Sequence, residues 1–354
     1  MSNAQTEFVH RALLAASIAA ALTVTLLALW QFADVMLLGF AGILLAVGWR
    51  GLAETLASRS PLSTEWSVAT VGVLLIVLAI AGGWWLGPDI VAGINQLFDQ
   101  LPGSLKKLEQ AVANYPAIEQ TISEVVENTD NGSLASGLME RVSSVFSAAF
   151  GVLATALAAL VGAVVILALG AYFASAPATY LDGAIRILPP RQRSRVAGVA
   201  AKAAHGLRWW LLGRLASMAV VGALTSTGLM LLGIPAALGL GVIAGLLSFI
   251  PNIGPILSAL PALLIGFGES PMTALYVAGL YLAIQTVESY AITPLIQQKA
   301  VTLPPALIIF VQLLFGAAFG FLGLLLATPL ALVILIAVDQ LYVRKLDSEL
   351  PEPT

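Results

Sequence analysis

The sequence predicts an all-α integral membrane protein with about six to eight transmembrane helices. Of its 354 residues, 59% are hydrophobic and only 10% are charged, whereas soluble domains carry about a quarter charged residues. Several apolar stretches approach the roughly 20 residues that a helix needs to cross the ~30 Å hydrocarbon core. Two further apolar regions are interrupted by proline and glycine, which predicts re-entrant or broken helical hairpins among the spans.

Uninterrupted apolar stretches predict the simple spans. They cover residues 13–30, 35–49, 66–86, 145–173, 209–232 and 272–292. Arg11 precedes the first stretch, as in a signal peptide, but no small-residue cleavage site follows Trp30, so we expect an uncleaved span. We therefore divide the chain into N-terminal transmembrane helices (1–86), an intervening segment (87–143) and a C-terminal core (144–354).

The segment 87–143 is acidic and helical in pattern. It carries eight carboxylates against three basic residues, and its apolar residues recur at helical spacing between Pro102, Pro116 and Asn131. We predict an extracytoplasmic set of amphipathic helices. They either lie on the outer membrane face or a neighbouring subunit, or form a small cap packed on itself.

Basic residues gather in particular loops and predict the orientation of the chain. Arg50 and Arg59 flank the second and third predicted spans, and Arg344 and Lys345 follow the last. Six more crowd the segment 176–208: Arg186, Arg191, Arg193, Arg195, Lys202 and Arg208. We expect these segments and both termini to be cytoplasmic. The arginine cluster could also meet anionic lipid head groups, but we prefer a role in fixing topology.

The first interrupted region, 234–268, breaks at the prolines of SFIPNIGPILSALP. A continuous helix through Pro251 and Pro255 is improbable, and each arm is too short to cross, so the region predicts a re-entrant hairpin. Non-helical backbone at membrane depth is tolerated only inside protein or beside a water-filled cavity. The break would place carbonyls, amides and the Asn252 side chain where a solute or ion could use them. The alternative is a tight turn at the membrane surface.

The second interrupted region, 303–341, contains Gly316, Gly320, Gly323 and Pro329 within an apolar run. It predicts another broken hairpin, although its second arm is long enough to span the membrane. The spacings Gly241-x-x-x-Gly245 and Gly316-x-x-x-Gly320 would permit close helix approach.

Polar residues inside these regions are the candidate site. Placing the carboxylate of Glu288 within a span costs at least ~2.5 kcal/mol, so it should face the protein interior with a partner. It is a candidate for proton or cation coupling, or it pairs with Arg214 or Lys299 and only holds helices in register. The candidates for solute or ion binding are Pro251, Asn252, Gly254, Pro255, Gln285, Glu288, Ser289, Thr293 and Gln312, with Arg214 as a possible charge partner.

Other classes of protein lack support in the sequence. There is no cysteine and there are only two histidines, so we expect no metal site. Motifs of hydrolases, metalloproteases and nucleotide-binding proteins are missing, which predicts neither an enzyme nor a cofactor. A net charge of −3 does not favour a nucleic-acid partner.

Five segments resemble a family of bacterial membrane proteins, the autoinducer-2 exporter-like permeases. They are LPPRQRSRV, WWLLGRL, GIPAALGLGVIAGLLSFIPNIGPILSALPALL, VESYAITPLI and GFLGLLLATPLALV. The resemblance covers nearly the whole chain. It implies a multi-span carrier of the bacterial inner membrane and a homo-oligomer. Arg214 and Asn252 depart from the family's commonest residues, glutamine and an aromatic residue respectively.

Three functional hypotheses follow. In the first, the chain is a secondary transporter that exports a small polar solute such as the autoinducer-2 signal, through a site formed by the broken segments. In the second, it exchanges a monovalent cation for a proton at Glu288, and the resemblance implies that the cation is sodium or lithium. In the third, it is a membrane scaffold that transports nothing and binds partners through the segment 87–143.

Overall fold

The computed structural model describes residues 30–78, 80–84, 156–292 and 304–343, with scattered positions between 10 and 27 and at 87, 88 and 91. Within these ranges the chain is helical and contains no strand, so the predicted all-α membrane fold is confirmed. The predicted span 13–30 is described only in part, and the N-terminal part of 145–173 and nearly all of the segment 87–143 lie outside the described residues.

Three helices pack together at the N-terminal side of the fold. α2 (Ala33–Ala57) and α6 (Ala156–Ser175) approach so closely that a Cβ on Gly42 or Gly170 would clash with the facing helix. The helix Thr64–Trp84 joins them through Trp49, whose indole N–H donates to the carbonyl of Val68 at 2.8 Å. Small residues therefore set the distance between these helices, as is usual in membranes.

Beyond α6 the chain turns sharply into a short helix, α7 (Pro177–Arg186), and then a long one, α8 (Pro190–Leu231). With 42 residues, α8 is about 63 Å long, twice the thickness of the hydrocarbon core. The predicted span 209–232 is its C-terminal half. The predicted basic segment 176–208 comprises α7 and the N-terminal half of α8.

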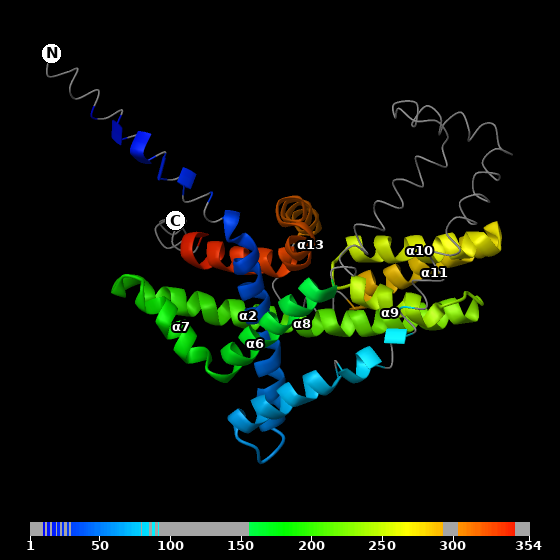
Figure 1. Cartoon of the computed structure of the whole chain (residues 1–354), viewed down its shortest axis with the longest axis horizontal. Helices are drawn as coiled ribbons and strands as arrows, with labels where there is room; N and C mark the ends of the chain where they lie inside the picture. The colour runs from blue at the N-terminus through cyan, green and yellow to red at the C-terminus, as the bar shows by residue number, and fades with distance from the viewer. Residues whose placement is uncertain are drawn as a thin grey trace, which may run out of the picture.

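The first interrupted region folds as two short helices joined by a tight turn. α9 (Ala237–Leu247) and α10 (Ile253–Glu269) have 11 and 17 residues, and the turn between them holds Ser248 to Asn252. α9 packs on α8 through Gly222, Gly241 and Gly245, whose backbones lie in near contact. In Figure 1, α8, α9, α10 and α11 (Pro271–Val287) lie side by side.

The second interrupted region, α13 (Pro305–Val338), is broken at Gly320, where φ is 62° and ψ is −147°. A Cβ on Gly316 would lie 3.5 Å from the side chain of Leu324. Residues eight apart in a straight helix are about 12 Å apart, so the chain folds back at Gly320. Gly320 therefore acts as a hinge between the two arms of α13. A Cβ on it would meet no atom within 4 Å, so it does not mediate a close contact with another helix. After Val338 the chain continues as the π-helical turn η2 (Asp339–Val343).

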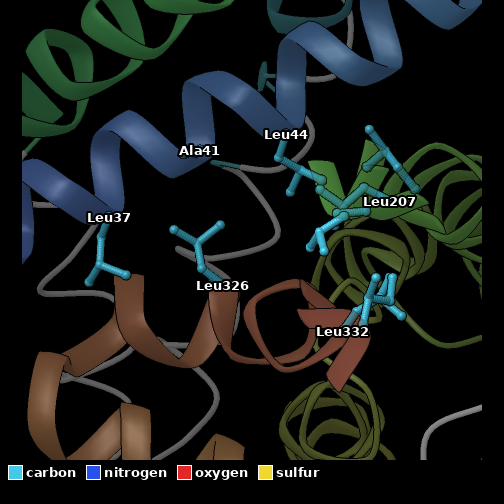
Figure 2. Close-up of a cluster of buried hydrophobic side chains, with 10 residues drawn as sticks. Leu37, Ala41, Leu44, Leu207, Leu326 and Leu332 are labelled. Carbon is cyan, nitrogen blue, oxygen red and sulfur yellow. The ribbon is translucent and has the colours of Figure 1, made fainter. Parts of the chain in front are cut away.

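The main apolar core lies where α2, α8 and α13 meet. Figure 2 shows Leu37 and Leu44 of α2 beside Leu207 of α8 and Leu326 and Leu332 of α13. In the described part of the chain, four helices are long and apolar enough to cross a membrane, or five if α6 and α7 count as one bent span. This is below the predicted six to eight. The short arms α9 and α10 and the 17-residue α11 do not reach the full length, and the span 13–30 is only partly described.

Candidate functional site

The turn between α9 and α10, at Ser248 to Asn252, departs from helical backbone. The carbonyl of Pro251 accepts the amide N–H of Ile253 at 2.7 Å, and Asn252 between them has φ 64° and ψ −47°. This is a γ-turn of the rare, strained kind. Gly254 follows directly, where a Cβ would meet the backbone of Leu247, so only glycine lets the two arms come together.

Arg214 of α8 holds one carbonyl of this turn. Its Nε donates to the carbonyl oxygen of Phe249 at 3.1 Å, and its Nη1 lies 3.0 Å from Oε1 of Glu288. The side chain of Arg214 is 11% exposed and that of Glu288 is 6% exposed. Two opposite charges are thus removed from water together, which a membrane protein tolerates when they pair.

Glu288 lies where α11 gives way to a π-helical turn, η1 (Glu288–Ile292). Its Oε1 also accepts the hydroxyl of Ser217 at 2.7 Å. Trp210, Arg214 and Ser217 are spaced i, i+4 and i+7 and so share one face of α8. The ring of Trp210 stacks edge-on against Phe249 at 5.5 Å. This face of α8 therefore binds both the unwound turn and the buried carboxylate.

Gln312 connects the second broken helix to the first. Its Nε2 donates to the carbonyl of Pro251 at 3.0 Å and lies 3.5 Å from the hydroxyl of Thr328, in the other arm of α13. Gln312 is fully buried. Within the described residues, Oε1 of Gln312 and Nη2 of Arg214 are buried without a hydrogen-bond partner. One acceptor and one donor therefore remain free on the two side chains that hold the turn.

The structure brings together only some of the predicted residues. Pro251, Arg214, Glu288 and Gln312 are joined by contacts around the turn, and Gly254 and Pro255 begin the adjoining helix. Ser289 and the side chain of Asn252 are exposed instead.

The remaining predicted residues lie apart from this cluster. Gln285 donates to the exposed hydroxyl of Ser289 at 3.3 Å. Tyr281, on the same predicted stripe, donates to the carbonyl of Ser258 in α10 at 3.1 Å. Thr293 and Lys299 lie outside the described residues. Of the two partners considered for Glu288, Arg214 is the one seen.

Sequence reasoning missed Ser217 and the role of Trp210. Their i, i+4, i+7 spacing with Arg214 is the signal that could have found them.

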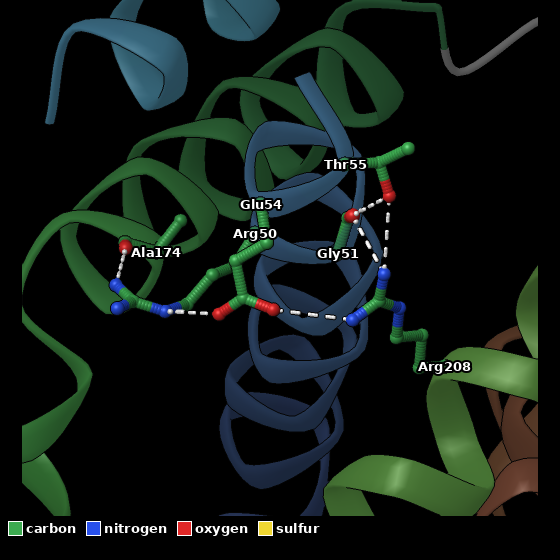
Figure 3. A network of polar contacts seen from close by, with 6 residues as sticks. All are labelled: Arg50, Gly51, Glu54, Thr55, Ala174 and Arg208. Carbon is green, nitrogen blue, oxygen red and sulfur yellow. Dashed lines mark hydrogen bonds and ion pairs between the residues drawn. The ribbon is translucent and has the colours of Figure 1, made fainter. Parts of the chain in front are cut away.

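It also missed a second polar network, shown in Figure 3. Glu54 of α2 bridges Arg50 and Arg208 at 3.1 Å each. Arg208 further donates to the carbonyl of Gly51, and Arg50 to that of Ala174 in α6. This network ties α2, α6 and α8 together, so two of the arginines counted for topology also hold the fold. In the described residues, no group of three or more His, Asp or Glu could hold a metal ion.

Broken helices that meet beside a buried charge pair are a feature of many membrane transport proteins. The sequence model of the AI-2E family transporter matches residues 19–343. The chain belongs to this family.

Curated relatives carry transport names as well. The chain is similar to the putative transport protein YueF of Bacillus subtilis, with 26% identity over 75% of this chain and 74% of the relative. It is 29% identical to the putative permease PerM of Escherichia coli over 75% of both chains. It is 36% identical to the AI-2 transport protein TqsA of Escherichia coli over 28% of this chain and 29% of that one.

Proposed function

We propose that this chain is a secondary transporter that exports a small polar solute across the bacterial inner membrane. The first candidate solute is AI-2, which the name of the relative TqsA specifies. We further propose cytoplasmic termini, in keeping with the basic residues of the segment 176–208, and a homo-oligomeric assembly. Family membership supports transport but leaves the solute open.

The observation that carries the proposal is the pair of unused polar atoms beside the unwound turn. Nη2 of Arg214 is a donor and Oε1 of Gln312 is an acceptor, and both are buried without a partner in the described part of the chain. A buried polar atom without a partner costs about 1–3 kcal/mol. A solute with hydroxyl and carbonyl groups would supply a partner for either atom, and its binding would recover that cost.

Through the same two side chains, a bound solute would also affect the backbone of the turn. Arg214 and Gln312 hold the carbonyls of Phe249 and Pro251, which flank the turn. A solute that competes for either side chain would release its carbonyl and with it one anchor of the turn. Binding would therefore favour a second arrangement of the two arms, which alternating access requires.

A second candidate function is exchange of a monovalent cation for a proton. The specific observation in its favour is the buried carboxylate of Glu288, which sits at the start of a π-helical turn. π-Helical turns occur frequently at functional sites. In this mechanism, opening of the Arg214–Glu288 pair would free the carboxylate for either a proton or a cation.

Purified protein in liposomes tests both candidates. With a pH dye inside, sodium, lithium or potassium gradients are imposed on wild type, on Glu288→Gln and on Glu269→Gln, a control that changes an exposed carboxylate. Proton movement that the cation drives and that only Glu288→Gln abolishes would establish the antiporter. If no variant moves protons, efflux of AI-2 from loaded liposomes is measured next, with Gln312→Leu as the site variant. Equal efflux from wild type and Gln312→Leu would refute the proposed solute site.

The scaffold hypothesis depends on the segment 87–143, which is almost entirely outside the described residues. Deletion of residues 99–130 separates it from transport. A scaffold would lose its function in this variant, whereas a transporter built on the broken helices would keep its flux.

A further inference from the structure

α7 leaves the end of α6 almost at a right angle. The axes of α6 and α7 differ by 88° across a break at Ala176, which has φ −134° and ψ 57°. Pro177 lacks an amide proton and disfavours helical backbone in the residue before it, so the corner is set by the sequence. The 20 residues of α6 rise about 30 Å, the thickness of the hydrocarbon core. If α6 crosses the membrane near its normal, the 88° bend directs α7 along the membrane plane.

The residues of α7 are divided sharply between two faces. On a helical projection Tyr180, Leu181 and Ile187, just after the helix, fall on one side, whereas Asp182 and Arg186 fall on the other. No residue of α7 is buried, and Ile187 is 86% exposed. Tyr180 packs edge-on against Phe173 of α6, with ring centroids 4.9 Å apart, whereas Leu181 and Ile187 remain exposed. An amphipathic helix with exposed apolar residues is typical of helices that lie in the membrane interface.

Positive charge surrounds this helix. Residues 177–195 contain the four arginines Arg186, Arg191, Arg193 and Arg195 and a single carboxylate, Asp182. Two of the arginines are used within the protein. Arg193 donates to the carbonyls of Arg186 and Leu188, and Arg195 donates to those of Gln340 and Leu341.

The other two arginines, Arg186 and Arg191, are exposed at the corner between α7 and α8. The charge of this corner is complementary to anionic lipid head groups.

We propose that α7 and the turn after it form an anchor that lies in the membrane interface and binds anionic phospholipids through Arg186 and Arg191. The apolar face, with Leu181 and Ile187, enters the acyl boundary. The anchor fixes the N-terminal half of α8, which carries Lys202 and Arg208 and leads directly to Arg214. The lipid composition would thus act on the helix that bears the candidate site. This inference does not depend on which solute is transported.

The first experiment measures the depth of α7. Because the chain has no cysteine, single-cysteine variants can be labelled without background. Leu181→Cys and Ile187→Cys report on the apolar face, and Thr179→Cys and Asp182→Cys on the polar face. Each is labelled with an environment-sensitive dye in nanodiscs that contain phosphatidylglycerol. We expect blue-shifted emission and quenching by acyl-chain nitroxide lipids for the first pair only.

Two outcomes would overturn the anchor. If all four sites show emission typical of water and no quenching by lipid, α7 does not lie in the membrane. If the apolar sites are blue-shifted but escape the nitroxide lipids, another protein surface, such as a second copy of the chain, covers them.

The second experiment measures lipid selectivity. The protein is purified in detergent micelles that contain phosphatidylglycerol and phosphatidylcholine. The lipids that stay bound are counted by native mass spectrometry. Removing each arginine should lower the enrichment of phosphatidylglycerol by up to about fivefold, so Arg186→Gln/Arg191→Gln should lose most of it. Arg59→Gln, which removes an exposed charge elsewhere, should not. Unchanged enrichment in the double variant would overturn the proposed role of the two arginines. Size-exclusion chromatography verifies that each variant is folded.

Discussion

The two broken helices of this protein are broken in different ways. Between α9 and α10, five residues leave the helix, and side chains from α8 and α13 hold two of their carbonyls. In α13, a single residue, Gly320, turns the chain, and a Cβ built there would meet no atom within 4 Å. The first break depends on contacts with other helices, whereas the second depends on the conformational freedom of glycine.

This difference separates a polar site from a hinge. The break at residues 248–252 is surrounded by the Arg214–Glu288 pair and by Gln312, so a change in polar contacts would move it. A Cβ built on Gly320 would meet no atom within 4 Å. By turning the chain, Gly320 brings Thr328 of the second arm of α13 next to Gln312 of the first arm. Chemistry is therefore concentrated at the first break, and the second positions one of its side chains.

The largest expected effect comes from removing one charge of the pair at the first break. Arg214→Leu would leave Glu288 buried without its partner, which costs about 3–5 kcal/mol in comparable pairs. We expect a marked fall in the melting temperature of the detergent-solubilised protein, followed by circular dichroism.

A double variant isolates the charge from the packing. Arg214→Leu/Glu288→Leu removes both charges, and well-packed apolar replacements of buried pairs are often neutral. Its melting temperature should lie well above that of Arg214→Leu. If the two variants are equally unstable, the contacts of Arg214 with the turn matter more than its charge pair.

The second prediction concerns the hinge. Gly320→Ala forces a side chain into a backbone region that is essentially restricted to glycine, at a cost of about 1–3 kcal/mol. Gly316→Ala is the matched control, because a Cβ there would lie at an ordinary contact distance from Leu324 and alanine favours helix. Thermal melts should rank Gly320→Ala clearly below Gly316→Ala. The reverse ranking would mean that Gly320 does not hold the left-handed backbone.

Sequence reasoning predicted the breaks better than the contacts across them. Prolines at 251 and 255 and glycines in an apolar run exclude a continuous helix by local sterics, so both interruptions could be read from the chain. Arg214, 74 residues before Glu288, was one of the two partners that the sequence suggested, the other being Lys299. Which side chain reaches which carbonyl depends on how α8, α11 and α13 cross, and spacing along one helix does not determine that.

The role of Asn252 illustrates the same limit. Its polar side chain suggested a ligand group, but the structure exposes it and uses the residue for a γ-turn. A positive φ leaves little trace in a sequence, because asparagine is frequent both in binding sites and in such turns.

The third prediction tests the bond between the two breaks. Gln312→Leu removes the donor to the carbonyl of Pro251, which still accepts the amide of Ile253. The lost bond is worth about 1 kcal/mol, but the variant also removes the unpaired Oε1, so the net loss should stay below that value. Thr328→Val serves as control, because it leaves the bond to Pro251 in place. A melting temperature for Gln312→Leu as low as that of Arg214→Leu would mean that Gln312 supports the fold much more widely than its contacts indicate.

The smallest expected effect on stability distinguishes backbone from side chain at the first break. Asn252→Gly should change the free energy of unfolding by less than about 1 kcal/mol, because glycine relieves the positive φ but loses more entropy on folding. Asn252→Ala should be the less stable of the two, since alanine tolerates that φ poorly. If Asn252 acts through its backbone, the glycine variant keeps transport in the liposome assay and the alanine variant loses part of it. Loss of flux in a stable Asn252→Gly protein would instead show that the exposed amide contacts the solute, and the binding site would then extend from the buried pair to the protein surface.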